Sequence, residues 1–375
     1  MPAETQILSY CPMKTFMYSQ ITPLIVVFLF ICSGFGAQLN GQDRVEHPEG
    51  ELQPTSADDI WPQTMSGSNY NEFWTYHFYL ENELEITLIF SIANFGSLKS
   101  PVSGARASIL GFGGDDYQVL REYPLDRLVT DKDRYQMKLR RDRDIWIEGK
   151  LPDKHSVHFV TTKDGVSYDI RLEMKNIQQG YKWGNGIFSV DGSRVGIVTH
   201  IPYADVSGTV KINDREKKVS GSAYMDHIFQ DKITTRLFSD GFRFVYHNGP
   251  DNWEAGHFLG RDRRDERNII GYTLVRNNNN TSLKKPRRLI RSDSERVFGH
   301  DLPKKLEIEF TDGSKRSVER VRDRERFEML QELGRLARRV ARGYLRGEVI
   351  EFRGEARFVN NSSDVPVRYN YFIVD

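Results

Sequence analysis

Cysteine is nearly absent from this sequence: its 375 residues include two, Cys11 and Cys32, and both precede residue 40. Removal of that N-terminal segment leaves no thiol, which excludes disulfide bonds and cysteine metal sites from the rest of the chain. An excess of charge is absent too, since 53 Lys and Arg oppose 52 Asp and Glu for a formal net charge of +1. This balance gives no electrostatic reason to expect a nucleic-acid partner. Core packing must therefore provide most of the stability.

Common catalytic and cofactor motifs are missing as well. The sequence contains no H-E-x-x-H, no C-x-x-C, no phosphate-loop consensus, no G-x-S-x-G and no G-x-G-x-x-G on a strand-to-helix turn. The nine histidines show no metal-ligand spacing, and His155 and His158 would point to opposite faces of a strand. We therefore expect no metal and no organic cofactor.

Long apolar runs are scarce, and the clearest one lies near the N-terminus. Residues 24–31, LIVVFLFI, follow Lys14 and precede the small residues Ser33, Gly34, Gly36 and Ala37, which is the order of an export signal. The run is shorter than the roughly 20 residues that a membrane span needs. We expect residues 1–37 to be a signal peptide of an exported protein, periplasmic or secreted, with a retained membrane anchor as the alternative. Residues 38–59, polar and containing Pro48 and Pro54, are expected to form a flexible leader.

Short runs with near period-two alternation fill most of the chain after residue 60. They lie at 74–80, 84–93, 105–112, 135–139, 144–148, 157–161 and 168–174, and then at 235–238, 241–247, 253–261, 269–276, 305–310, 349–359 and 367–374. This spacing is typical of antiparallel barrels, and no helical stretch is long enough for a βαβ crossover. Two similar series on either side of residue 230 predict a duplicated barrel, with domains at 60–230 and 231–375.

One segment, residues 323–345, breaks the β pattern. Its apolar residues recur at steps of three and four, while arginines occupy much of the rest. The stripe consists of Phe327, Leu330, Leu333 or Gly334, Ala337, Val340 or Ala341, and Tyr344. The pattern predicts one amphipathic helix packed on a barrel wall. A basic amphipathic helix can also lie on an anionic membrane surface, so peripheral membrane contact stays open as an alternative. Residues 277–288, four asparagines and then a basic run, are expected to be a solvated loop.

The strongest candidate for chemistry is VSGSAYMDHIF, residues 219–229, in which Asp226 and His227 follow an alternating run that predicts a strand. Successive strand side chains point to opposite faces, so one of the two is expected to face a cavity unless the strand ends or bulges there. Histidine can exchange a proton near neutral pH, and a neighbouring carboxylate can set its tautomer. A purely structural hydrogen-bond pair is the alternative.

A family resemblance centres on the same motif. Residues 198–231, VTHIPYADVSGTVKINDREKKVSGSAYMDHIFQD, resemble the central signature of the family that joins AttH-like proteins to carotenoid 1,2-hydratases, with fungal survival-factor and Diels-Alderase relatives more distant. The shared elements are a Pro-containing strand, a V-x-G-x-V strand, a polar turn and the G-x-A-Y-x-D-H run. Weaker likeness extends over most of the chain after residue 58. The resemblance implies an all-β fold of two tandem lipocalin-like antiparallel β-barrels, here with one C-terminal amphipathic helix, around an apolar cavity.

The resemblance also implies a chemistry. In the hydratases of that family, the His of the D-H motif and an aromatic residue two positions later are implicated in hydrating an isoprenoid double bond. His227 matches that His, whereas Phe229 stands where the hydratases carry Trp. The resulting hypothesis is an exported protein that encloses a hydrophobic, isoprenoid- or polyene-like ligand and acts as a hydratase or cyclase. His227 would protonate a double bond while Asp226 orients it or balances its charge. A non-enzymatic lipid carrier is the alternative.

Further residues are expected to bind the ligand. Trp253 and His257 share one face of a predicted strand, while Glu254 takes the other, and either face could line a cavity. His200 and Tyr203 belong to the resembling signature and are expected at the junction of the barrels, where interface hydrogen bonding is their alternative role. The full set of ligand-binding candidates is Tyr224, Phe229, Trp253, Glu254, His257, His200 and Tyr203.

Overall fold

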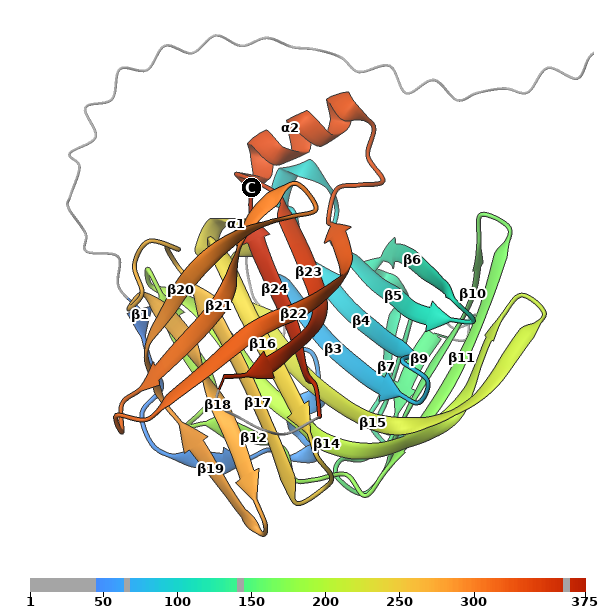
Figure 1. The fold of residues 1–375 in the computed structure, drawn as a ribbon. Coiled ribbons are helices and arrows are strands. Elements are labelled where there is room, and N and C mark those ends of the chain that lie inside the picture. Colours follow the sequence, from blue (N-terminus) through green and yellow to red (C-terminus); the bar gives the residue numbers. More distant parts are fainter. Residues whose placement is uncertain (1–44, 64–67, 140–144, 360–364) are drawn as a thin grey trace, which may run out of the picture. The chain divides into compact units, whose positions relative to one another are not determined.

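The computed structural model describes residues 45–63, 68–139, 145–359 and 365–375. The expected signal peptide and the first residues of the expected leader lie outside the described residues. The described chain is mostly β, with 65% in strands, and it forms two curled antiparallel sheets, one a near-barrel and the other a half-barrel (Figure 1). The predicted all-β class with two antiparallel barrels is confirmed.

The first sheet holds fifteen strands, and its central path runs β6-β5-β4-β3-β15-β14-β11-β10-β9-β8-β7. Its two longest strands, β14 and β15, are neighbours in the middle of that path. The strands are β1 Val45–Glu46, β2 Leu52–Pro54, β3 Asn71–Leu80, β4 Glu85–Ala93, β5 Val102–Phe112, β6 Asp115–Pro124, β7 Leu128–Asp131, β8 Gln136–Leu139, β9 Ile145–Glu148, β10 His155–Lys163, β11 Val166–Lys175, β12 Tyr181–Trp183, β13 Ile187–Val190, β14 Ser193–Ile212 and β15 Arg215–Gln230.

Alternation along β3 shows how the interior of the first sheet is built. Trp74, Tyr76 and Phe78 project to one face and join the main apolar core, because every second side chain of a strand shares a face. Phe90 and Phe159 enter the same core from β4 and β10. Large aromatic rings therefore occupy much of the interior.

The second sheet runs β19-β18-β17-β16-β24-β23-β22-β21-β20. The chain enters it after Gln230, the last residue of β15, through the short helix α1 (Thr234–Leu237). Its strands are β16 Asp240–His247, β17 Asn252–Gly260, β18 Ile269–Asn277, β19 Asn280–Lys284, β20 Pro286–Val297, β21 His300–Phe310, β22 Lys315–Glu328, β23 Val349–Phe358 and β24 Val367–Val374.

Three local predictions in this half of the chain were wrong. Residues 235–237 lie in α1 rather than a strand, because a four-residue run is too short for its period to tell the two apart. The predicted loop at 277–288 contains β19 and the start of β20. The helix predicted over 323–345 is confined to α2 (Arg335–Leu345), because residues up to Glu328 pair with β23. No helix in the described ranges is long and apolar enough to cross a membrane.

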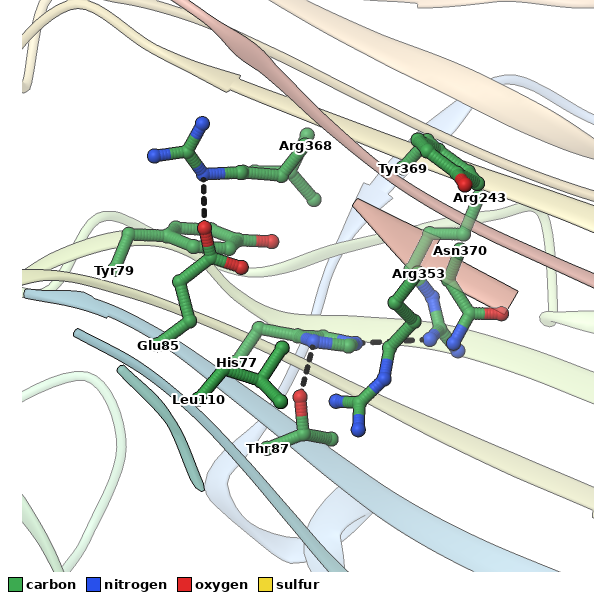
Figure 2. Close-up of a pocket in the computed structure, with 11 residues that line it drawn as sticks. His77, Tyr79, Glu85, Thr87, Leu110, Arg243, Arg353, Arg368, Tyr369 and Asn370 are labelled. Carbon is green, nitrogen blue, oxygen red and sulfur yellow. Dashed lines mark hydrogen bonds and ion pairs between the residues drawn. The ribbon is translucent and has the colours of Figure 1, made fainter. Parts of the chain in front are cut away.

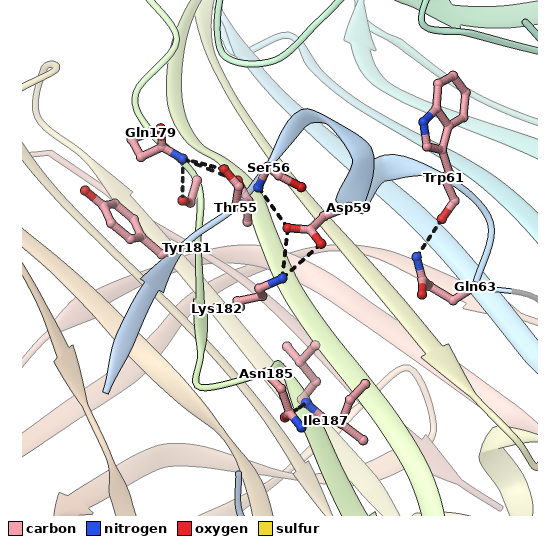
Figure 3. A network of polar contacts seen from close by, with 12 residues as sticks. Thr55, Ser56, Asp59, Trp61, Gln63, Gln179, Tyr181, Lys182, Asn185 and Ile187 are labelled. Carbon is pink, nitrogen blue, oxygen red and sulfur yellow. Dashed lines mark hydrogen bonds and ion pairs between the residues drawn. The ribbon is translucent and has the colours of Figure 1, made fainter. Parts of the chain in front are cut away.

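The segment expected to be a flexible leader takes part in the fold from Val45 onward. β1 pairs with β13, and β2 pairs with β12. The 3-10 helix η1 (Ala57–Ile60) is held beside β12, because Lys182 Nζ lies 2.9 Å from both carboxylate oxygens of Asp59 (Figure 3). The sequence did not reveal this attachment because the paired runs are only two and three residues long.

Candidate functional site

The Asp226–His227 motif lies inside a continuous strand. β15 pairs with β3 without a register shift, so that Asp226 lies opposite Thr75 and His227 opposite Trp74. Irregularity occurs instead on β14, between Thr199 and Ala204. The two side chains consequently project to opposite faces of the sheet, His227 into the first sheet's interior and Asp226 toward the second sheet.

His227 forms a buried pair with a carboxylate from β3. Its Nε2 lies 2.7 Å from Glu72 Oε1, and the two side chains are 0% and 2% exposed. The Trp74 ring stacks on the imidazole at a centroid distance of 4.6 Å and an interplanar angle of 17°. Glu72 Oε1 also accepts the Gln63 N–H at 2.7 Å, and Trp74 Nε1 donates to the carbonyl of Ile60 at 2.8 Å. The chain from Ile60 to Gln63 thus holds the pair in position.

A second imidazole adjoins His227. The ring of His200, on β14, stacks on that of His227 at a centroid distance of 5.6 Å and an interplanar angle of 23°. Burial, and to a smaller extent the nearby His227, holds the pKa of His200 well below its ordinary value. Both ring nitrogens of His200 and Nδ1 of His227 find no hydrogen-bond partner among the described protein atoms. Buried polar atoms of this kind are normally satisfied by water or a ligand. The three nitrogens therefore indicate a site where a polar group of a ligand, or a water molecule, can form hydrogen bonds.

Phe229 closes another side of this group. Its ring centroid lies 5.2 Å from that of His227, on the same face of β15. The ring occupies the space above Gly196 of β14, where an added Cβ would lie 2.0 Å from Phe229 Cζ. The Phe229 ring can therefore lie against His227 only because residue 196 is a glycine and has no side chain.

A neighbouring hydrogen-bond chain extends the polar interior. Tyr76 O–H donates to His155 Nε2 at 2.8 Å, while His155 Nδ1 donates to the carbonyl of Gly149 at 3.1 Å. Burial lowers the pKa of His155 to about 4, so its imidazole is neutral near pH 7. His155 is therefore set up as a fixed hydrogen-bonding group rather than as a proton donor.

Asp226 belongs to a different network, between the two sheets. Arg243 of β16 binds both of its oxygens, with Nε at 2.7 Å and Nη2 at 3.0 Å, and His257 Nδ1 lies 3.2 Å from Oδ2. Tyr224 O–H donates to the same Oδ2 at 3.0 Å. Burial alone would raise the pKa of Asp226, but Arg243 and His257 outweigh it and hold that pKa below its ordinary value. Asp226 is thus a permanent anion that joins β15 to β16 and β17.

The same network borders a small cavity between the sheets. Arg243 Nη1 donates to His77 Nε2 at 3.0 Å, and His77 Nδ1 lies 3.1 Å from Thr87 Oγ1 (Figure 2). Arg353 and Arg368 also line this space, which measures about 20 Å³. Burial and then the charge of Arg106 lower the pKa of Arg353 to about 9. The volume suits about one water molecule, so this cavity is too small for an organic ligand.

The remaining candidates lie away from His227. Trp253 is buried in an apolar cluster, and it shares a face of β17 with His257, as the alternation predicted. Glu254 projects to the other face and pairs with Arg316, whose Nε and Nη2 lie 2.8 and 2.6 Å from its oxygens. Tyr203 donates its O–H to Asp205 at 3.0 Å. Of the predicted site residues, His200 and Phe229 lie beside His227, and Tyr224 and His257 lie beside Asp226.

Sequence reasoning missed two residues of the His227 group, Glu72 and Trp74. A signal was present in NEFWTYHFYL, where Glu72 shares its strand phase with Trp74, Tyr76 and Phe78. A carboxylate on an otherwise aromatic inward face is costly to bury unless it has a partner, and that cost points to a function or a buried pair. Within the described parts of the chain, no group of three or more His, Cys, Asp or Glu side chains could hold a metal ion.

Comparison with solved structures finds proteins of similar fold. An AttH-like protein from Nitrosomonas europaea matches with a TM-score of 0.58 and 13% identity, over 83% of this chain and 94% of that one. CghA, crystallised with Sch210972, matches with a TM-score of 0.58 and 11% identity, over 88% and 94%. Kievitone hydratase from Nectria haematococca matches with a TM-score of 0.48 and 12% identity, over 88% and 97%.

The first two of these matches show that the chain has the fold of the AttH-like barrel proteins. The resemblance predicted from residues 198–231 is therefore confirmed at the level of the fold. No family model matches the chain, and no curated protein sequence matches it significantly.

Proposed function

We propose that this chain is an exported, cofactor-independent hydratase or cyclase in which His227 protonates a double bond of a hydrophobic, isoprenoid- or polyene-like ligand. The observation that carries the proposal is the fully buried His227–Glu72 pair, with Nδ1 of His227 and both nitrogens of His200 left without partners. A buried acid–base pair beside unsatisfied polar atoms is typical of functional sites rather than of packing.

Glu72 takes the role that the sequence suggested for Asp226. As an imidazolium, His227 donates Nε2–H to the Glu72 carboxylate 2.7 Å away, which stabilises the charge and sets the ring orientation. The Nδ1–H is then the one proton left to transfer. Asp226 is unsuited to this role because Arg243 and His257 already bind its oxygens on the opposite face of β15.

The proton transfer balances without a cofactor. The π electrons of the double bond form a new C–H bond with the Nδ1 proton, the N–H bond breaks, and the adjacent carbon becomes a cation. In hydration, a water oxygen bonds to that carbon and its proton returns to Nδ1. In cyclisation, the π electrons of a second double bond form a C–C bond with the cation, and the new cation so formed loses a proton from its neighbouring carbon to Nδ1, which leaves a double bond in the ring product. The π faces of Trp74 and Phe229 stabilise positive charge, and neutral His200 can orient the water.

The comparisons support this proposal only through the fold. CghA, a two-barrel protein, has been crystallised with Sch210972, which is consistent with a ligand-binding role for such barrels. A non-enzymatic lipid carrier is the second candidate function. It is favoured by Phe229 at the position where the hydratases carry Trp, because a phenyl ring lacks the N–H that could help to hold water.

The test begins with native mass spectrometry of the wild-type protein purified from its own host, followed by organic extraction of its cargo. The extract is then incubated in D2O with the wild type, His227→Gln, Glu72→Gln and a control, His300→Gln, at a hairpin far from the pair in sequence. We expect the wild type and the control to add carbon-bound deuterium or one water to the cargo, and the first two variants to lose most of this activity. Equal conversion by His227→Gln would overturn the catalytic role, and unaltered lipid throughout would favour the carrier.

A further inference from the structure

Exposed apolar side chains gather around α2. Leu336 and Val340 lie on this helix and are 77% and 59% exposed, and Leu333 just before it is also exposed. Leu98 and Phe298 are exposed on two neighbouring turns. Of the large apolar side chains that are exposed in the described chain, Val321 on β22 is the one outside this group.

The helix presents these residues outward. Ala341 and Leu345 are its buried residues, and they pack with Ile233. At about 100° per residue, Leu336 lies on the opposite side of the helix from Leu345. The exposed leucine and valine therefore form a second apolar face rather than the edge of the packed one. Figure 1 shows α2 beyond the strand ends of the second sheet.

Two contacts bring the neighbouring turns to this helix. The Ser97 N–H donates to Tyr344 Oη at 3.1 Å, which places the 3-10 helix η2 (Gly96–Leu98) beside α2. Arg326 donates to the carbonyl of Phe298 at 3.0 Å and, together with Arg338 of α2, pairs with Glu328. Phe298 has a φ of 45°, a strained conformation for a bulky residue, with its ring facing solvent.

Positive charge surrounds this apolar face. Arg338 and Arg342 pair with described carboxylates, Glu348 among them. Arg335, Arg339 and Arg346, by contrast, form no ion pair with any described residue, and all three are exposed. An apolar patch edged by unpaired arginines is complementary to a surface that is apolar inside and negatively charged outside. A second copy of the chain would bring like charges together, which disfavours self-association through this face.

We propose that α2, with the turns at Leu98 and Phe298, is a docking surface for an anionic lipid bilayer. Leu336, Val340 and Phe298 enter the acyl boundary, while the arginines bind lipid phosphates and carboxylates. The inference does not depend on the chemistry proposed for His227. Contact with such a bilayer explains both the exposure of the apolar residues of α2 and the positive charge around them.

The test attaches an environment-sensitive fluorophore to position 336 in a full-length chain carrying Leu336→Cys, Cys11→Ser and Cys32→Ser. Vesicles of phosphatidylcholine alone are compared with vesicles that also contain phosphatidylserine. We expect a blue shift with the phosphatidylserine vesicles at low salt, a weaker shift at high salt and none with phosphatidylcholine alone. The same label at Val321→Cys, exposed on β22, is expected to stay unshifted.

Charge variants complete the test. Arg335→Gln/Arg339→Gln in the labelled chain is expected to weaken vesicle binding roughly thirtyfold, since each of the two basic residues near the membrane contributes about 1 kcal/mol. Arg287→Gln/Arg357→Gln is the matched control. It removes two exposed arginines from the strand ends of the second sheet that face away from α2, and it is expected to leave vesicle binding unchanged. Equal shifts at positions 336 and 321, equal binding to both vesicle types, or self-association at this face without lipid would overturn the proposal.

Discussion

At the scale of single residues, Asp226 and His227 differ because consecutive strand positions meet different surroundings. Asp226 accepts hydrogen bonds from Arg243, His257 and Tyr224, so its negative charge is fully compensated. His227 has one carboxylate partner and one free ring nitrogen. Adjacent residues of a motif can therefore divide into a structural ion and a candidate proton donor.

The buried neutral histidines predict a pH dependence. Burial lowers the pKa of His155 and of His247 to about 4, whereas each titrates near 6.5 when the chain unfolds. The unfolded state therefore binds more protons between these values, and stability falls as the pH drops from about 6.5 toward 4, by on the order of 3 kcal/mol per histidine. Above pH 6.5 these histidines do not make the free energy of unfolding depend on pH. The lowered pKa of Asp226 adds a further loss below about pH 4.

Urea unfolding at a series of pH values measures this effect. The double variant His155→Gln/His247→Gln is expected to make the decline between pH 6.5 and 4 shallower, because it removes two of the buried histidines whose protonation the fold resists. The same slope in the variant as in the wild type would show that other groups control the acid sensitivity.

At the scale of secondary-structure elements, the packing of β14 against β15 depends on Gly196. Gly196→Ala is expected to destabilise the fold by about 1–3 kcal/mol, since the new Cβ would overlap the Phe229 ring. Gly196→Ala/Phe229→Leu is expected to cost less than the sum of the single variants, because the smaller side chain relieves the overlap. A double-mutant cycle by thermal unfolding measures the coupling. Additive costs would mean that the backbone moves instead of the ring.

The helix α2 shows why a helical pattern does not set the helix boundaries. Apolar spacing of three and four continues from Phe327 to Tyr344, yet Phe327 pairs with Glu351 as part of a sheet. Hydrogen bonds to β23 satisfy the backbone there, which local periodicity does not take into account. From Arg335 to Leu345 the chain pairs with none of the described strands, and it forms helical hydrogen bonds instead.

At the scale of the whole molecule, Asp226 joins the two sheets. Asp226→Asn is expected to lower the free energy of unfolding by about 3–5 kcal/mol, because it leaves the buried Arg243 without its carboxylate. Asp169→Asn, which breaks the exposed pair with Arg171, is expected to cost at most about 1 kcal/mol. Chemical denaturation measures both variants. A loss for Asp226→Asn no larger than for Asp169→Asn would contradict the structural role, whereas Asp226→Asn/Arg243→Met should recover part of the stability.

The sequence by itself determined the class of fold and the central motif. Alternation of apolar residues encodes strand faces directly, so most strands from Trp74 to Val374 were predictable, and so was the division of Trp253 and Glu254 between two faces. The ordered signature around His227 was enough to indicate an AttH-like fold. These features are local, and a linear pattern can carry them.

Only the tertiary structure decided which residues meet. Glu72 and His227 are 155 positions apart in the chain, and the pairing of β3 with β15 brings them within 2.7 Å. The Arg243–Asp226 contact and the attachment of residues 45–60 to β12 and β13 likewise depend on strand order. Strand order results from the burial of whole faces against one another, and short-range patterns do not specify it. The fold class was therefore readable from the sequence, while the partner of His227 was not.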